Sequence, residues 1–265
     1  MAKVSVNGIE FYYEKTGKGP PLLLIAGFAT HLGMWEKMTP YLRESFEVTI
    51  FDNRGSGRTP ATTPPYTIEL LADDTLALMD ALKIEKAHIA GFSMGNAVAQ
   101  MIALKHPERV LKNVLISPFP TLPATAIMQT QVTAKLFQAE VDPAMAFETI
   151  LPWIFSNEYL SDPQRIEETI HHLLNDPYPQ PPEGYAGQLE AITHFDLTER
   201  LAKIKTPTLL LAGEEDLYTP FPIVKNMRTH LPHATLIGLP KQGHMLHVET
   251  PETIAKEICA FCKSE

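Results

Sequence analysis

The sequence has few cysteines, no long apolar run and no cluster of basic residues, and each absence removes a class of protein. No apolar stretch approaches the roughly 20 residues that a membrane-spanning helix needs, and Met1–Val6 lacks the apolar core of a secretory signal. The net charge is −9. Without a basic cluster to displace counterions, we expect no binding to nucleic acid. These absences predict a cytoplasmic protein with no membrane span.

The two cysteines, Cys259 and Cys262, form a C-x-x-C pattern near the end of the chain. Redox-active pairs usually lie at a helix N-terminus, where the helix dipole stabilises a thiolate. This pair falls at the end of the expected C-terminal helix, so we interpret both cysteines as packing residues. No second cluster accompanies them, and we therefore expect neither a metal site nor a cofactor.

The most informative segment that is present is Gly91-Phe-Ser-Met-Gly95, a G-x-S-x-G pentapeptide. A short β-rich segment precedes it at 86–90, and a segment of helical composition follows at 96–105. A strand-to-helix turn of this kind lifts the serine hydroxyl clear of the backbone, and the glycines allow neighbouring backbones to approach closely. The context therefore predicts Ser93 as a nucleophile.

A serine nucleophile needs a base and an orienting acid, here expected in the chain order serine, acid, histidine. Candidate acids follow the expected strand 208–212, and we favour Asp216 over Glu214 and Glu215 because it lies furthest past the strand. A last strand is expected at 234–238, and of the histidines that follow it we favour His244 as the base, with His247 as its competitor. All three favoured residues fall at the ends of expected strands, where α/β sheets place their sites.

Backbone donors near this serine are expected to bind a developing oxyanion. The apolar strand 22–26 ends in Gly27, which allows the N–H of Phe28 to turn toward the site. Met94 begins the helix after the serine, so its N–H lies at the positive end of the helix dipole. We therefore assign the oxyanion hole to the amides of Phe28 and Met94. His31 follows this loop and is the other histidine of interest.

These motifs together resemble the α/β-hydrolase superfamily, and within it the group of esterases, 3-oxoadipate enol-lactonases and carbon–carbon bond hydrolases. The matching segments span essentially the whole chain: Gly27-Phe28, Phe51–Gly57, the 91–95 pentapeptide, Gly213–Asp216 and Gly243-His244. The resemblance implies nucleophile Ser93, acid Asp216, base His244 and oxyanion donors Phe28 and Met94, with a structural role for Asp52–Gly57. Two departures are Ala26-Gly27 where many relatives have His-Gly, and Asn96 where a second glycine is common.

The pattern of elements predicts an α/β-hydrolase fold, a mostly parallel doubly wound sheet. A hairpin at 4–15 and strands near 21–26, 47–51, 86–91 and 111–117 alternate with helices near 34–44, 67–82 and 95–106. Residues 118–200 contain ten of the 23 prolines and helix-like runs at 125–138, 143–155 and 163–174. We expect 118–200 to be a helical cap inserted into a core of 1–117 and 201–265, which ends in a helix near 251–262.

The cap is expected to cover the site and to select the substrate. Its apolar residues include Trp153, which we expect to contact substrate together with Phe28 and Met94. Small-molecule pockets are mainly apolar, so the prediction is a small apolar carboxylic ester or lactone cleaved through an acyl-enzyme. The only cap arginines are Arg165 and Arg200. We expect both to be solvent-exposed, which disfavours an anionic enol-lactone.

Other activities stay open on the same residues. The chain could cleave a carbon–carbon bond in a ring-fission product, or act as a 3-oxoadipate enol-lactonase. Some proteins of this fold are instead small-molecule receptors or signalling proteins. The sequence leaves the natural substrate, the pathway and the oligomeric state open.

Overall fold

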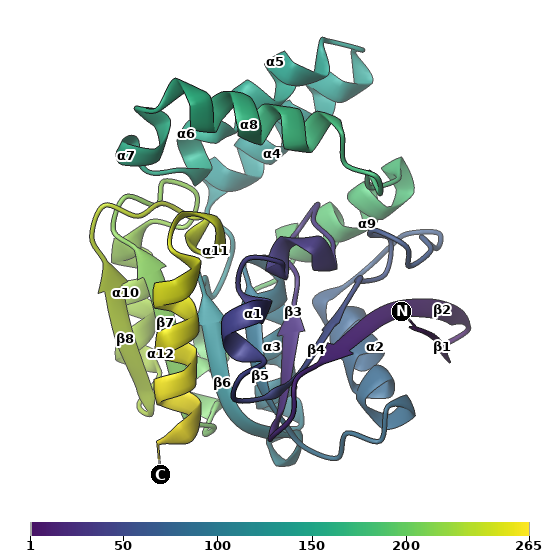
Figure 1. Cartoon of the computed structure of the whole chain (residues 1–265), viewed down its shortest axis with the longest axis vertical. Helices are drawn as coiled ribbons and strands as arrows, with labels where there is room; N and C mark the ends of the chain where they lie inside the picture. Colours follow the sequence, from purple (N-terminus) through teal and green to yellow (C-terminus); the bar gives the residue numbers. More distant parts are fainter. Residues whose placement is uncertain (1, 265) are drawn as a thin grey trace.

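A computed structural model describes residues 2–264, which form an eight-stranded sheet flanked by helices (Figure 1). The spatial order of the strands is β1-β2-β4-β3-β5-β6-β7-β8. β1 pairs with β2 and β2 with β4 in antiparallel fashion, and every other pairing is parallel. The strand bounds are β1 Ala2–Val6, β2 Ile9–Thr16, β3 Pro21–Ile25, β4 Glu47–Phe51, β5 Ala87–Phe92, β6 Val110–Ile116, β7 Thr208–Gly213 and β8 Ala234–Leu239.

Both faces of the sheet are covered, which explains why central strands such as β3 and β7 have consecutive apolar residues rather than alternating ones. In β3, Leu23 and Ile25 join one core cluster with helices α2 (Ile68–Ala81), α3 (Met94–Lys105) and α10 (Phe221–His230). Leu22 and Leu24 join a second cluster with α1 (Thr39–Leu42) and α12 (Pro251–Lys263) on the opposite face. The sheet is therefore doubly wound, as the sequence predicts.

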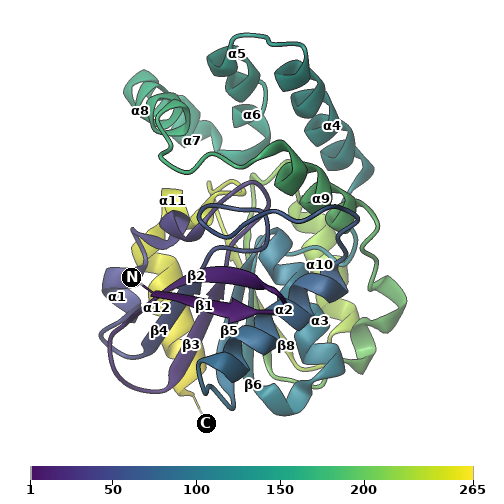
Figure 2. The same ribbon diagram turned by 90° about the vertical axis from the view of Figure 1, so that its right-hand side faces the viewer.

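Between β6 and β7 the chain leaves the sheet and forms helices only, apart from an isolated bridge between Thr121 and Asp196. These helices gather at one end of the molecule in both views, with α9 nearest the sheet (Figure 2). Their bounds are α4 Ala124–Gln138, α5 Pro143–Glu148, α6 Leu151–Ile154, α7 Asn157–Leu160, α8 Pro163–Leu174 and α9 Pro182–Thr193.

Some predicted helices are wrong in extent. The helix expected over 34–44 is a 3₁₀ turn at Leu32–Trp35 followed by the short α1, whose first turn contains Pro40. The run expected over 143–155 divides into α5 and α6, because Pro152 lacks the N–H that a continuous helix requires and sits in the first turn of α6. Four helices, α7, α9, α10 and the short α11 (Leu246–Glu249), were not among those expected from the sequence.

The segment after β4 braces the loop that follows β3. Asp52 accepts hydrogen bonds from the backbone N–H of Leu32 through Oδ1 and of Arg58 through Oδ2, each at 2.8 Å. Arg54 forms a buried bidentate ion pair with Asp74 of α2, with both N–O distances at 2.7 Å. These contacts agree with the structural role expected for Asp52–Gly57. Over residues 2–264, no helix combines the length and apolarity needed to cross a bilayer.

Candidate active site

Ser93 occupies a sharp turn between β5 and α3. Its backbone has φ 50° and ψ −114°, a left-handed conformation that is strained for a residue with a side chain. A Cβ on Gly91 would overlap the carbonyl oxygen of Gly95, and a Cβ on Gly95 would overlap that of Ile25. Both glycines of the pentapeptide are therefore required by close backbone contact, as the sequence predicts.

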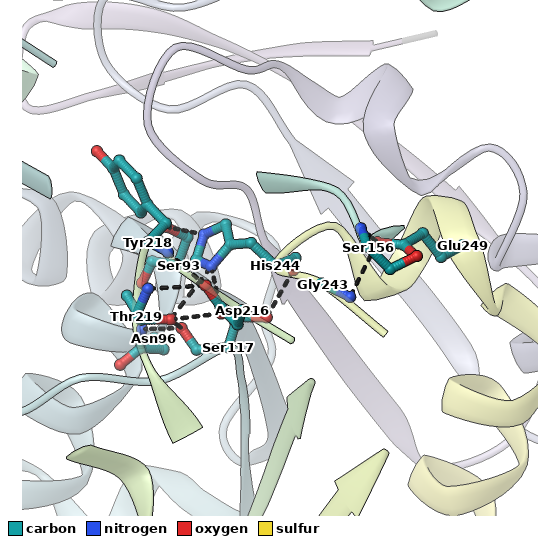
Figure 3. Close-up of polar contacts among 10 residues, drawn as sticks. All are labelled: Ser93, Asn96, Ser117, Ser156, Asp216, Tyr218, Thr219, Gly243, His244 and Glu249. Carbon is teal, nitrogen blue, oxygen red and sulfur yellow. Dashed lines mark hydrogen bonds and ion pairs between the residues drawn. The ribbon is translucent and has the colours of Figure 1, made fainter. Parts of the chain in front are cut away.

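The structure brings Ser93, His244 and Asp216 together in one chain of hydrogen bonds (Figure 3). The hydroxyl oxygen of Ser93 lies 3.0 Å from Nε2 of His244, and Nδ1 of the same ring lies 2.8 Å from Oδ2 of Asp216. The three residues are 6%, 3% and 3% exposed, so bulk water competes little for these contacts. In this arrangement a neutral imidazole protonated at Nδ1 donates to the carboxylate and accepts the serine proton at Nε2.

The Asp216 carboxylate is held by further donors from the loop that follows it. Its Oδ1 accepts the N–H groups of Tyr218 and Thr219 at 2.8 Å, and its Oδ2 accepts the Thr219 hydroxyl at 2.7 Å. The Thr219 Oγ1 also lies 3.1 Å from Nδ1 of His244. These bonds orient the carboxylate toward the imidazole and give its buried oxygens hydrogen-bond partners.

The competing acids point elsewhere. Glu214 is exposed, and the carboxylate of Glu215 accepts the N–H of Asn157, the first residue of α7, at 2.8 Å. Of the three acidic residues that follow β7, it is Asp216 whose carboxylate reaches the His244 ring.

The competing histidine, His247, is buried on α11 and packs edge-to-face on Phe92, with ring centroids 4.5 Å apart. Burial, with smaller contributions from His244 and Lys37, lowers the pKa of His247 to about 3. Its Nδ1 has no hydrogen-bond partner among the described residues. Among the described residues the Ser93 hydroxyl is bonded by His244 and not by His247, so this neutral, buried ring is suited to packing rather than to proton transfer.

The two amides expected to donate to an oxyanion are those of Phe28, in the loop after β3, and Met94, the first residue of α3. Within residues 2–264, neither the Phe28 N–H nor the Met94 N–H has a protein acceptor, so both remain available to a ligand. The next amide, that of Ala29, is bound at 3.4 Å by Gln188 of α9, whose Nε2 donates to the Arg54 carbonyl at 2.9 Å. α9 therefore holds the loop that carries Phe28.

The other residues singled out in the sequence lie around this loop and the helical segment. The Phe28 ring contacts the edge of Tyr185, with centroids 4.7 Å apart. Trp153 is half-buried on α6 and packs against the same cluster as Phe28 and Met94. His31 pairs with Asp176 at 3.2 Å. Within residues 2–264, no group of three or more His, Cys, Asp or Glu side chains is arranged to hold a metal ion.

Sequence reasoning missed several residues that support the site. Ser117, after β6, donates its hydroxyl to the carbonyl of His244 at 2.7 Å. Asn96 donates its side-chain amide to the Ser93 carbonyl, and its Oδ1 accepts from Gln100 at 2.5 Å. The departure at Asn96 was a usable signal, because an amide next to the turn can hold it. Ser117 gave no signal, since its partner lies 127 positions away.

Comparisons with known proteins agree with this geometry. The sequence model of the alpha/beta hydrolase fold family matches residues 20–251. A relative from Caulobacter sp. (strain K31), whose name as a carbamate hydrolase (RutD) is provisional, is 29% identical over 100% of this chain and 99% of its own length. The enol-lactonase from Burkholderia xenovorans LB400 is 27% identical, with a TM-score of 0.87 over 99% of this chain and all of its own.

A thermophilic esterase from Thermogutta terrifontis is also similar, at 28% identity and a TM-score of 0.84 over 97% of this chain and 96% of its own. The two solved structures, one named an enol-lactonase and the other an esterase, thus share the fold of this chain over nearly their full lengths. The strand order, the strained serine turn and the match over residues 20–251 together show that this chain belongs to the alpha/beta hydrolase fold family and is a hydrolase.

Proposed function

We propose that the chain is a serine hydrolase that cleaves a small, mainly apolar carboxylic ester or lactone through an acyl-enzyme. The observation that carries this proposal is the unbroken hydrogen-bond chain from the Ser93 hydroxyl through His244 to Asp216. The donors around Asp216 support it, because they hold the carboxylate in the orientation that the imidazole needs.

The first half-reaction forms the acyl-enzyme. His244 takes the hydroxyl proton at Nε2 as the Ser93 oxygen bonds to the acyl carbon, and Asp216 stabilises the imidazolium without itself taking a proton. The amides of Phe28 and Met94 donate to the oxyanion, and each such donor lowers the barrier by roughly 3 kcal/mol in comparable sites. The carbon–oxygen bond to the alcohol then breaks, and the imidazolium returns its proton to the departing oxygen.

The second half-reaction repeats these steps with water. His244 removes a proton from the water as its oxygen attacks the acyl carbon of the ester on Ser93. The same two amides hold the second oxyanion. The bond to the serine oxygen breaks, and the proton returns from the imidazolium to Ser93, releasing the carboxylic acid.

The helical segment 118–200 serves in this proposal as a cap that selects the substrate. Phe28 and Trp153 pack against the core cluster that contains Met94, and the Phe28 ring contacts Tyr185. In this proposal these side chains supply the apolar surface that contacts the substrate. Of the two cap arginines, Arg165 is exposed, as expected, and is paired with Asp162. The same expectation is wrong for Arg200, which is half-buried at the end of the helical segment. Because Arg165 is exposed and already paired with a carboxylate, it is not placed to bind an anionic substrate, which favours an uncharged one. The similarity to an enol-lactonase favours including lactones, and the similarity to a relative provisionally named a carbamate hydrolase favours including carbamates.

The test is hydrolysis of p-nitrophenyl acetate and butyrate by wild type and Ser93→Ala. The variant is expected to fold normally by circular dichroism and to lose turnover and labelling by a serine-directed phosphonate. Ser161→Ala, which alters an exposed serine, is the matched control. Wild-type rates in Ser93→Ala would remove Ser93 from its role.

A wider substrate panel separates the remaining activities. Lactones, carbamate esters and a vinylogous ring-fission product are compared with simple esters of increasing acyl length. A stable ligand adduct with negligible turnover would instead support a receptor or signalling protein.

A further inference from the structure

Glu249, the last residue of α11, connects two segments that are far apart in the sequence. Its Oε1 accepts the N–H of Gly243 at 3.1 Å and the N–H of Ser156 at 3.2 Å, while its Oε2 accepts the hydroxyl of Ser156 (Figure 3). One carboxylate therefore receives three hydrogen bonds, one from the loop that carries His244 and two from the segment between α6 and α7.

Ser156 is itself built into the helical segment. It is the N-cap of α7, and its Oγ accepts the N–H of Tyr159 at 3.2 Å. The neighbouring backbone makes a second connection, because Met245 donates its N–H to the carbonyl of Ile154 at 3.0 Å. The 154–156 segment thus touches the residues on both sides of His244.

The two segments approach too closely for a side chain at Gly243. A Cβ there would lie 2.6 Å from both the carbonyl carbon of Phe155 and the backbone nitrogen of Ser156. Gly243 directly precedes His244, and the carbonyl of His244 is held from the other side by the Ser117 hydroxyl at 2.7 Å. The peptide group that follows His244 is therefore held directly, through its carbonyl by Ser117 and through the Met245 N–H by Ile154. The residue before His244 is held by the Glu249 carboxylate and by close packing against the 155–156 backbone.

The Glu249 carboxylate is partly removed from water. Burial raises its pKa, while the hydrogen bonds from Ser156 and Gly243 act in the opposite direction. Desolvation of a carboxylate is unfavourable, and stability alone does not call for a charged group at this place. The charged group is better explained by the need to hold the two segments in a fixed arrangement, since a carboxylate can accept all three hydrogen bonds at once.

We infer that Glu249 is a positioning residue, which together with Ser156 holds Gly243 and thereby sets the His244 imidazole at hydrogen-bond distance from Ser93. The inference rests on the proposed function for its kinetic consequence. It assigns the helical segment a part in ordering the proposed base, in addition to covering the site.

The kinetic test compares Glu249→Ala, Glu249→Gln, Ser156→Ala and the Glu249→Ala/Ser156→Ala double variant on p-nitrophenyl butyrate. We expect Glu249→Ala to lower kcat about tenfold with KM within about twofold, because misplacement of a catalytic group slows chemistry more than binding. Ser156→Ala should have a smaller effect, since the Ser156 N–H still donates. Glu249→Gln should recover most of kcat, because its amide oxygen still accepts from Gly243.

The double variant distinguishes a shared role from two separate ones. If the residues act through one contact, it should be no slower than Glu249→Ala alone. Glu252→Ala and Ser161→Ala remove exposed side chains of the same types and should retain wild-type kcat. Kinetics of Glu249→Ala and Ser156→Ala that match wild type, or effects that multiply in the double variant, would overturn the inference.

A second measurement does not require turnover. The ring-nitrogen NMR signals of His244, assigned with His244→Asn, report its hydrogen bonds to Asp216 and Ser93. They should shift in Glu249→Ala and return toward wild type in Glu249→Gln.

Shifted signals in an enzyme that hydrolyses no ester would support positioning and contradict the proposed function. Unchanged signals in Glu249→Ala and Ser156→Ala would contradict positioning whatever the activity. If Glu249→Ala fails to fold, the kinetics and the NMR signals are measured on Ser156→Ala and Glu249→Gln instead.

Discussion

Nδ1 of His244 lies 2.8 Å from Oδ2 of Asp216, whereas the adjacent Glu215 directs its carboxylate to the backbone of Asn157. Two neighbouring acids in one loop therefore contact different parts of the molecule. The Thr219 hydroxyl and amide hold the Asp216 carboxylate in its orientation. The acid that can orient the imidazole is thus selected by loop geometry, and its role is open to direct test.

Asp216→Asn is expected to lower kcat for p-nitrophenyl butyrate by roughly 10³- to 10⁴-fold with little change in fold. The asparagine amide can donate to Nδ1, which places the imidazole proton on Nε2 and prevents it from accepting the serine proton. Steady-state kinetics measure the effect, and Glu214→Gln, at an exposed position, is the control. A loss below about tenfold would show that Asp216 does not orient the base.

Gly91→Ala is expected to destabilise the fold by about 3 kcal/mol or more, because its methyl group would overlap the Gly95 carbonyl within the serine turn. Gly8→Ala is the matched control. Gly8 has φ +81°, and a Cβ at this position would have no atom within 4 Å, so only backbone strain of about 1 kcal/mol is expected. Urea unfolding gives both values. Equal losses would mean that the turn relaxes to admit the methyl group.

His247→Gln is expected to flatten the dependence of stability on pH. Burial lowers the pKa of His247 to about 3 in the folded protein, from an ordinary value near 6.5. Between these values the unfolded chain binds more protons. The contribution of His247 is therefore complete above pH 6.5 and is lost as pH falls toward 3.

From pH 7.5 to 5.0, the loss for one such histidine is about 2 kcal/mol. The difference in free energy of unfolding between wild type and His247→Gln should shrink by this amount, as measured by urea unfolding at both pH values. His233→Gln changes an exposed histidine and serves as the comparison. Parallel pH profiles for wild type and His247→Gln would show that His247 is protonated to the same extent in both states.

Much of the framework is local in origin and could be predicted. The apolar run 22–25 forms a strand that is buried on both faces. Gly91 and Gly95 lie where the backbone packs too closely for any side chain, as the pentapeptide predicts. The favoured serine, acid and histidine meet in space, because parallel strands deliver their carboxyl ends to one edge of the sheet. The helices between β6 and β7 were harder to predict. Pro152 gave a local signal for the break between α5 and α6, whereas the existence of α9, with a proline at its start and two glycines, depends on packing.

The sequence by itself determined the alternation of strands and helices and the identity of the strained serine, because apolar periodicity and glycine act within a few residues. Only the tertiary structure decided which acid and which histidine join that serine, and which residues hold them in place. Thr219, Ser117 and Glu249 act across 25, 127 and 93 positions of the chain on His244, His244 and Ser156 respectively. Contacts of that range arise from the packing of the whole chain, and no local pattern encodes them.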